Sequence, residues 1–255
     1  MKMEYNPTEL MACVAGRVLE DNRSVFVGTG LPIIASMLAQ RLHAPNLLIM
    51  FEAGGIGPKI PTIPISVGDS RTFHRGVMAA TMDYVMSCAQ LGLIDYGFLG
   101  AAQIDPYGNL NTTVIGPHDA PKVRLPGSGG ANDVGSLCHR TIILMRHDTR
   151  RFVERLDYIT TPGYLTGPRA REKAGLPAGS GPYRVITQLG VMDFDIETKR
   201  MRLTSVHPGV SVDEVVENTG FELVMADEVS MTEPPTEREL RLLREEIDPA
   251  GIVIG

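Results

Sequence analysis

A single carboxylate, Glu52, stands at the end of an apolar run, and one alanine separates it from two glycines. The run over Leu47–Phe51 is typical of a buried β-strand, and Ala53, Gly54 and Gly55 follow the carboxylate. Open α/β sheets bind their ligands at the carboxyl ends of strands, and glycine lets a ligand or another backbone segment approach closely. We therefore expect Glu52 to act as a nucleophile.

Two further glycine loops accompany this carboxylate. Gly28-Thr29-Gly30 follows the apolar run Ser24–Val27, and residues 127–130 read Gly-Ser-Gly-Gly. Glycine loops at strand ends can direct backbone N–H groups at one point, which is what an oxyanion hole requires. We expect both loops to converge on Glu52.

The first glycine loop also suggests a dinucleotide-binding turn. It follows a strand and precedes a helix, and Glu52 ends the next strand, where a ribose-binding acid belongs. The third position of that fingerprint requires a small residue for close helix–strand packing, but Ile33 occupies it, and Pro32 stands at the start of the helix. A nicotinamide cofactor is therefore disfavoured, because a lone glycine pair is a weak signal.

Other catalytic classes lack their sequence signatures. The six histidines are scattered, with no pair at metal-ligand spacing, and no Gly-x-Ser-x-Gly nucleophile elbow follows a strand. The three cysteines lack Cys-x-x-Cys spacing, which suggests reduced thiols and neither a disulfide framework nor a zinc site. Arg71 and Arg75, in the loop after Glu52, are the basic residues that we expect to meet an acidic ligand.

The composition is that of a soluble globular protein. Hydrophobic residues make up 43% of the 255 residues, charged residues make up 21%, and the net charge is -6. Nucleic-acid surfaces need clustered basic residues, so this balance argues against a nucleic-acid partner. The amino terminus lacks the apolar segment of a signal peptide, and no stretch approaches the roughly 18 apolar residues of a membrane span. We expect a cytoplasmic protein with no membrane partner.

The first elements along the chain predict a parallel sheet. Asn6-Pro7-Thr8-Glu9 is a helix start, with an N-cap and a glutamate three residues later. Strand Ser24–Val27, helix Ile33–Leu42 and strand Leu47–Phe51 then form a βαβ unit. We expect one α/β domain over residues 1–255, with an open, mostly parallel sheet flanked by helices and with additional antiparallel strands.

The remaining segments predict loops, strands and short helices. Gly54–Arg75 and residues 160–182 are rich in Gly and Pro, and long loops of this kind in compact domains are usually functional or disordered. Ser211 with Glu214 and Thr236 with Glu239 predict two capped helices near the end of the chain. The other predicted elements are a helix over Gly76–Gln90 and strands over Ile94–Gly100, Arg140–Met145, Arg184–Asp195 and Lys199–Val206.

Specific motifs extend in order over nearly the whole chain. They read V-G-T-G-L-P (27–32), F-E-A-G-G (51–55), S-V-G-D (66–69), G-A-A-Q-I-D-P-Y-G-N-L-N (100–111), G-S-G-G-A-N (127–132), E-N-T-G-F-E-L (217–223) and R-E-E-I-D-P (244–249). Together they resemble the B (β) subunit of family I CoA-transferases, and in particular the small subunit of glutaconate CoA-transferases.

The resemblance implies a fold, a partner and a covalent mechanism. It implies the open α/β fold of that family, and an active site at the interface with a homologous A (α) subunit in an α2β2 or higher assembly. Glu52 would then attack an acyl-CoA thioester and carry CoA as a glutamyl-CoA thioester to a small carboxylic or dicarboxylic acid. Coenzyme A is thus expected as a substrate, with no tightly bound cofactor and no metal.

The same resemblance assigns the remaining site residues. Backbone N–H groups near Thr29 and in the second glycine loop would stabilise the oxyanion, and loop 56–66 together with the partner subunit would exclude water. Gln103 and Asn132 would hold acyl or CoA amide groups, although a structural role in turns is an equal alternative for each. The residues implied in oxyanion or CoA binding are Gly28, Thr29, Gly30, Gly54, Gln103, Gly129, Gly130, Ala131 and Asn132.

Other functions on the same scaffold stay open as alternatives. Family relatives that hydrolyse or decarboxylate CoA esters have lost this glutamate from the B chain of the pair. Glu52 therefore favours CoA transfer over an acyl-CoA hydrolase or a C–C lyase. It also disfavours a non-catalytic subunit that only binds CoA.

Overall fold

The computed structural model describes residues 4–255, which form two compact units. The first unit comprises residues 4–98 and 234–255, and the second comprises residues 99–233. The start of the predicted domain, residues 1–3, lies outside the described residues, and the expectation of a single domain over 1–255 stays a prediction.

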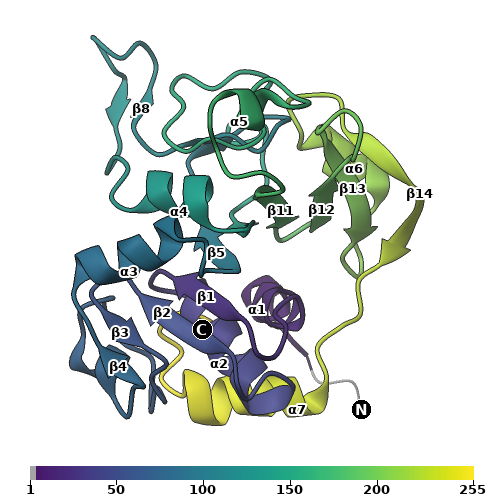
Figure 1. The fold of residues 1–255 in the computed structure, drawn as a ribbon. Helices are drawn as coiled ribbons and strands as arrows, with labels where there is room; N and C mark the ends of the chain where they lie inside the picture. The colour runs from purple at the N-terminus through teal and green to yellow at the C-terminus, as the bar shows by residue number, and fades with distance from the viewer. Residues whose placement is uncertain (1–3) are drawn as a thin grey trace. The chain divides into compact units, whose positions relative to one another are not determined.

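The first unit is an α/β structure whose central strands are parallel (Figure 1). Its strands lie in the order β5-β1-β2-β3-β4. Strand β1 is parallel to both β2 and β5, whereas β3 and β4 are antiparallel additions at the edge. Its elements are α1 (Pro7–Arg17), β1 (Ser24–Val27), α2 (Leu31–Leu42), β2 (Leu48–Phe51), β3 (Gly55–Ile56), η1 (Ser70–Phe73), β4 (Met78–Ala79), α3 (Met82–Gln90), β5 (Tyr96–Leu99), α7 (Glu237–Arg241) and η2 (Leu242–Ile247).

The amino-terminal and carboxyl-terminal segments pack together in this unit, as the purple and yellow helices of Figure 1 show. Asn6 caps α1 through a capping box with Glu9, and the buried Glu9 carboxylate also accepts two hydrogen bonds from Arg244. On the other side, Arg17 of α1 binds the buried carboxylate of Glu239. These hydrogen-bonded ion pairs, each with a buried carboxylate and a partly exposed arginine, fix α7 and η2 on the helical layer.

The second unit contains a five-stranded mixed sheet in the order β14-β13-β12-β11-β10. Strand β11 is parallel to β10, β12 is antiparallel to both of its neighbours, and β14 is parallel to β13. Its elements are β6 (Gln103–Ile104), β7 (Leu110–Asn111), β8 (Val114–Ile115), β9 (Val123–Arg124), α4 (Ala131–Leu137), β10 (Arg140–Leu144), α5 (Ala170–Lys173), β11 (Gly181–Ile186), β12 (Gly190–Phe194), β13 (Met201–Val206), α6 (Val212–Glu217) and β14 (Val224–Met231).

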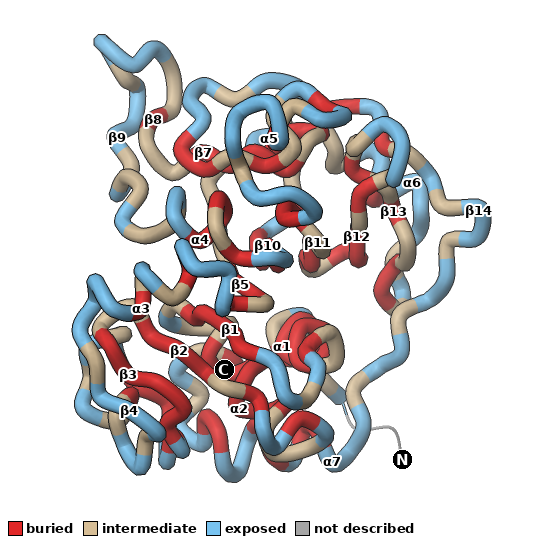
Figure 2. Tube along the Cα trace, viewed as in Figure 1, coloured by how far each residue is buried: buried red, intermediate tan, exposed pale blue. Residues whose placement is uncertain are grey.

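Each unit has its own apolar core, seen as the buried segments of Figure 2. In the first unit, side chains of β1 and β2 such as Val25, Ile49 and Phe51 are fully buried, and residues 33–39 of α2 are buried on all sides of the helix. In the second unit, a buried cluster around Ile143, Val185 and the sheet residues beside them is covered by aromatic side chains. Burial on both faces explains why β1, β2 and β10 read as continuous apolar runs.

The structure confirms the predicted α/β class, the additional antiparallel strands and most of the predicted elements. Strand Ser24–Val27 has the predicted bounds, and the capping boxes at Asn6 and Thr236 are both formed. The prediction for Arg184–Asp195 was wrong, because the chain turns at 187–189 and makes the hairpin of β11 and β12. The helix over Gly76–Gln90 begins only at Met82, since residues 78–79 pair with β3.

Candidate functional site

Glu52 lies at the carboxyl edge of two adjacent parallel strands. The register of β1 and β2 pairs Ser24 with Leu48 and Val27 with Phe51. Gly28 and Glu52 therefore follow paired residues and leave the sheet at the same edge. This is the edge at which parallel α/β sheets carry their ligands.

A tight turn presents the Glu52 side chain. The Gly54 N–H donates to the Phe51 carbonyl oxygen at 2.9 Å, so Glu52 and Ala53 occupy the two central positions of the turn. Glu52 is half-buried, and no residue within 4–255 makes a hydrogen bond or an ion pair to its carboxylate. A carboxylate that no protein group occupies is available as a nucleophile.

The glycines after Glu52 are required by the approach of other backbone segments. A Cβ atom at Gly54 would lie 2.0 Å from the Ala80 carbonyl oxygen, and Gly54 has a φ of 111°. A Cβ atom at Gly55 would lie 2.1 Å from the Thr72 carbonyl oxygen. Glycine at this turn could serve the close approach of a ligand or of another backbone segment, and the structure shows the approach of another backbone segment. A role of Gly54 in CoA binding stays a prediction.

The first glycine loop offers free N–H donors at the same edge. Gly30 is the N-cap of α2, has a φ of 82° and provides no side-chain cap. Within the described chain, the backbone N–H groups of Thr29, Gly30 and Leu31 have no hydrogen-bond partner. A Cβ atom at Gly28 or Gly30 would meet nothing within 4 Å, so open space adjoins the loop. These donors, together with the helix dipole, suit an anionic group.

The second glycine loop is anchored within its own unit. Gly127 and Thr112 exchange two hydrogen bonds of 2.8 Å, one from the Gly127 N–H and one from the Thr112 hydroxyl. Gly129 has a φ of 48°, Gly130 is the N-cap of α4 without a side-chain cap, and Ala131 begins that helix. The loop thus has a fixed path into α4, and open space adjoins Gly127 and Gly129.

Gln103 and Asn132 have structural partners in the second unit. The Gln103 side chain is buried, donates to Asp157 at 2.9 Å and accepts from Asn111 at 2.7 Å. The Asn132 amide donates to the Thr160 carbonyl oxygen at 2.9 Å. Of the two roles considered for each residue, the structure supports the structural one, and contacts with CoA stay a prediction.

A buried arginine that fixes α4 was not predicted from the sequence. Arg171 is 4% exposed, and burial lowers the pKa of its guanidinium to about 10. It meets neutral acceptors, and its Nε has no hydrogen-bond partner among the described residues. An arginine within a Gly- and Pro-rich stretch carries no signal of such a role. Its acceptors are the carbonyl oxygens of Pro162, Gly163, Gly135 and Ser136 and the hydroxyl of Ser180.

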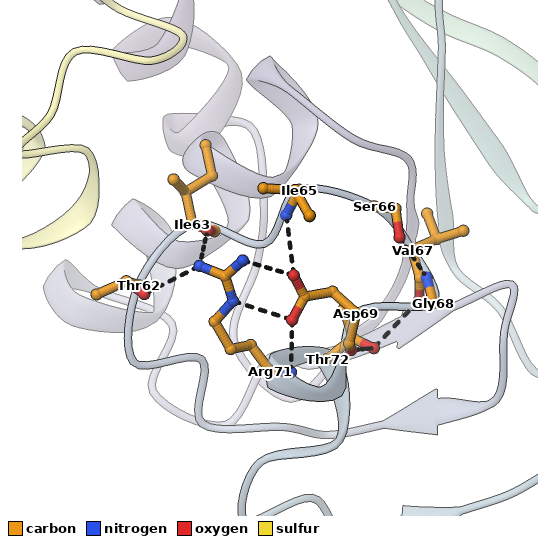
Figure 3. A network of polar contacts seen from close by, with 9 residues as sticks. All are labelled: Thr62, Ile63, Ile65, Ser66, Val67, Gly68, Asp69, Arg71 and Thr72. Atoms are coloured by element: carbon orange, nitrogen blue, oxygen red, sulfur yellow. Dashed lines mark hydrogen bonds and ion pairs between the residues drawn. The ribbon is translucent and has the colours of Figure 1, made fainter.

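Arg71 does not have the role that the sequence suggested. Its guanidinium binds the Asp69 carboxylate through two hydrogen bonds, with Nε to Oδ1 at 2.9 Å and Nη2 to Oδ2 at 2.5 Å (Figure 3). The Arg71 charge is therefore matched inside the loop, and the expectation that it meets an acidic ligand was wrong because Asp69 occupies it. Arg75 is exposed at the end of the same loop.

The described residues contain no group of three or more His, Cys, Asp or Glu side chains placed to hold a metal ion. Cys13, Cys88 and Cys138 are free thiols. In residues 4–255, no helix is both long and apolar enough to cross a membrane.

The predicted site residues fall into two groups. The first unit holds Glu52 beside Gly28, Thr29, Gly30 and Gly54. The second unit holds the other group, which consists of Gln103, Gly129, Gly130, Ala131 and Asn132. The convergence of this second group on Glu52 stays a prediction.

The fold and the Glu52 edge define an α/β protein suited to nucleophilic catalysis by a carboxylate. Residues 8–218 match the family of coenzyme A transferases. The chain is 40% identical to the B subunit of 3-oxoadipate CoA-transferase from Pseudomonas knackmussii, over 94% of this chain and 92% of that one. It is also 40% identical to the B subunit of glutaconate CoA-transferase from Acidaminococcus fermentans, over 98% and 95%. The chain belongs to the coenzyme A transferase family.

Solved structures agree with this assignment. Glutaconate coenzyme A-transferase from Acidaminococcus fermentans superposes with a TM-score of 0.94 at 38% identity, covering 99% of this chain and 98% of that chain. The decarboxylase AibA/AibB gives a TM-score of 0.83 at 27% identity, covering 98% of this chain and 97% of that one. The resemblance seen in the sequence motifs, the predicted fold and the enzyme class, a CoA-transferase, are therefore confirmed.

Proposed function

We propose that this chain is the B subunit of a heteromeric CoA-transferase in which Glu52 is the nucleophile. The observation that carries the proposal is the Glu52 carboxylate at the carboxyl edge of β1 and β2, which, like the N–H donors beside it, has no partner within the described residues. A homologous A subunit completes the site, in an α2β2 or higher assembly. Coenzyme A is a substrate, and no resident cofactor takes part.

The reaction proceeds through covalent intermediates on Glu52. Its carboxylate attacks the thioester carbonyl of an acyl-CoA, the C–S bond breaks, and an acyl-glutamyl anhydride and CoA thiolate form. The thiolate then attacks the glutamyl carbonyl, which releases the first carboxylate and leaves a glutamyl-CoA thioester. The acceptor carboxylate reverses both steps, leaves as the new acyl-CoA and restores Glu52. No step needs a proton, so no general base is required.

Backbone donors stabilise the charge that each addition creates. The attack on a carbonyl places negative charge on its oxygen, and preorganised N–H groups lower the energy of that state. Thr29 and Gly30 supply such groups in the first unit, and Gly129 and Gly130 supply them in the second. The N-terminus of α2 adds its dipole to the first set.

The names of the relatives indicate a class of acceptor. Glutaconate and 3-oxoadipate are both small dicarboxylates, and the chain is equally similar to the two transferases that are named for them. We therefore propose a small dicarboxylic acid as the acceptor and a short acyl-CoA as the donor.

The test is a transfer assay on the chain assembled with its A subunit. Acetyl-CoA and succinyl-CoA serve as donors, glutaconate and 3-oxoadipate serve as acceptors, and mass spectrometry follows the products. The proposal predicts new acyl-CoA in equal amount to the released acid, without accumulation of free CoA. Free CoA without a new acyl-CoA would instead identify a hydrolase, and cleavage of a C–C bond would identify a lyase. Binding of CoA without any turnover would identify a non-catalytic subunit.

A further inference from the structure

We propose that Asp69 and Arg71 are positioning residues that hold the Glu52 turn in its reactive geometry. They act through the segment 62–72, which we call the brace loop. The inference rests on the proposed function and deepens it, because it names the part of the chain that fixes the nucleophile. Neither residue contacts the Glu52 carboxylate among the described residues, so neither is a catalytic residue.

The brace loop is folded around one ion pair (Figure 3). Besides the two bonds to Arg71 Nε and Nη2, the Asp69 carboxylate accepts hydrogen bonds from the backbone N–H groups of Arg71 at 2.9 Å and Ile65 at 3.2 Å. Arg71 Nη1 donates to the Ile63 carbonyl oxygen at 2.7 Å. The hydrogen bonds from Arg71 hold the pKa of the Asp69 carboxyl far below its usual range. One bidentate pair thus joins both ends of the loop.

A buried threonine connects the Asp69 turn to the end of the brace loop by hydrogen bonds. Thr72 is fully buried, and its hydroxyl lies 2.7 Å from the Asp69 carbonyl oxygen and 3.1 Å from that of Val67. The Thr72 N–H donates to the same Asp69 carbonyl oxygen at 2.9 Å. The position of the Thr72 backbone is therefore set by the Asp69 turn.

The brace loop contacts the Glu52 turn at two places. The Thr72 carbonyl oxygen approaches Gly55 so closely that a Cβ atom there would lie 2.1 Å away. On the other side, a Cβ atom at Gly68 would lie 3.9 Å from the Ala53 Cβ. Ala53, directly after Glu52, thus lies beside the brace loop, and Gly55, directly after the turn, packs against it.

This arrangement explains how an unpartnered carboxylate keeps a defined position. Among residues 4–255, no side chain binds the Glu52 carboxylate to orient it, so its backbone must supply the orientation. A misplacement of about 1 Å in a reacting group costs on the order of 100-fold in rate. Loss of the Asp69–Arg71 pair releases the loop that supports Ala53 and Gly55, and the Glu52 backbone then moves with it.

The experiment compares three variants of the chain in complex with the A subunit. Asp69→Asn and Arg71→Met break the pair, and Arg71→Lys keeps the charge without the two-pronged geometry. We expect the kcat of transfer to fall about 10- to 100-fold in the first two variants, while the KM for acyl-CoA changes by less than about threefold. Arg71→Lys recovers part of the loss. The matched control is Arg23→Met, which breaks the Arg23–Asp95 ion pair beside the amino end of β1, away from the Glu52 edge, and should leave kcat unchanged.

A second measurement reads the position of the turn without using activity. Hydrogen exchange followed by mass spectrometry reports the peptide that contains the Gly54 amide, which is bonded to Phe51. We expect this amide to exchange at least about tenfold faster in Asp69→Asn and Arg71→Met than in the wild type. Unchanged exchange together with kcat within twofold of the wild type would overturn the inference. A rise in KM with unchanged kcat would also overturn it, because the loop would then bind substrate directly.

The proposed function and this inference fail in different ways. If the wild-type complex forms no CoA adduct on Glu52, the proposed function fails and takes the inference with it. If the wild type forms the adduct and both pair-breaking variants form it at the wild-type rate, only the inference fails.

Discussion

The Glu52 edge of the first unit and the amide side chains of Gln103 and Asn132 in the second unit differ in whether protein groups bind them. At the Glu52 edge, the carboxylate and the N–H groups of Thr29 and Gly30 have no partners among the described residues. Around the second loop, the Asn132 and Gln103 amides are all engaged by neighbouring protein groups. Groups kept free of protein partners are the ones available for chemistry, whereas engaged groups form the scaffold.

The largest effect is expected from Glu52→Gln, which tests whether the unpaired carboxylate takes part in the reaction. The amide cannot displace CoA thiolate, so the transfer rate of the assembled complex should fall by about 10⁴-fold or more. The Glu52 side chain has no partner to lose in the part of the chain that the structure describes, so the thermal midpoint should stay within about 2 °C of the wild type. Activity is measured with acyl-CoA and a dicarboxylate, and unfolding is measured by calorimetry. Retained activity would remove Glu52 from the mechanism.

Two glycine variants distinguish a glycine that is packed against other backbone atoms from a glycine that borders open space. Gly54→Ala places a methyl group 2.0 Å from the Ala80 carbonyl oxygen at a φ of 111°, and should destabilise the chain by about 3 kcal/mol or more. Gly28→Ala meets no atom within 4 Å and should change the unfolding free energy by less than about 1 kcal/mol. If acyl-CoA uses the space beside Gly28, that variant should lose activity while keeping its stability. Denaturant unfolding and steady-state kinetics measure the two effects.

On the scaffold side, Arg171→Met should be strongly destabilising. It removes the donors of carbonyl groups in α4 and the 162–163 segment, and we expect a loss of about 3 kcal/mol in the free energy of unfolding. The matched control is Arg169→Met, two residues earlier, whose side chain is 81% exposed and should contribute less than about 0.5 kcal/mol. Urea unfolding of both variants measures the difference. Equal effects would mean that Arg171 is not part of the scaffold.

A smaller, pH-dependent effect is expected from His147 in the second unit. Burial lowers the pKa of His147 to about 4, from an ordinary value of 6.5. As the pH falls, His147 is therefore protonated in the unfolded chain before it is protonated in the folded chain. The contribution of neutral His147 to the free energy of unfolding is complete above pH 6.5 and is lost as the pH falls toward 4. The stability difference between wild type and His147→Gln should shrink by up to about 3 kcal/mol over that range.

The measurement uses the difference between the two proteins because Asp105 acts in the opposite direction. Burial raises the pKa of Asp105 to about 6. The contribution of Asp105 to the free energy of unfolding is therefore present below pH 3.8 and is lost as the pH rises through 6. Asp105 is common to both proteins, and the subtraction removes it. A stability difference that stays constant from pH 7 to pH 4 would contradict the account.

Local signals made much of the first unit predictable. The capping boxes of Asn6 with Glu9 and Thr236 with Glu239 depend on residues three positions apart, which a sequence displays directly. Strand Ser24–Val27 and the run before Glu52 are apolar because both faces are buried. The motif around Glu52 is visible in the sequence for the same reason, since strand, carboxylate and glycines are contiguous, and the role of Glu52 as the nucleophile stays a proposal.

Features that depend on distant partners were missed. Strands β3 and β4 have two residues each and exist only because they pair with β2 and with each other. The role of Arg171 depends on carbonyl groups up to 36 residues away. Asp69 is only two residues from Arg71, but their pairing was also missed, because the fit of the guanidinium to the carboxylate depends on the fold of the brace loop. None of these contacts has a period or a motif in the sequence.

The central claim is that Glu52 carries CoA during the reaction. The direct test is to incubate the complex of this chain and its A subunit with an acyl-CoA donor, without an acceptor, and to analyse its peptides by mass spectrometry. We expect CoA attached at Glu52, a thioester that borohydride reduces with loss of activity, and no adduct in Glu52→Gln. Consumption of acyl-CoA without an adduct, together with an active Glu52→Gln variant, would contradict it.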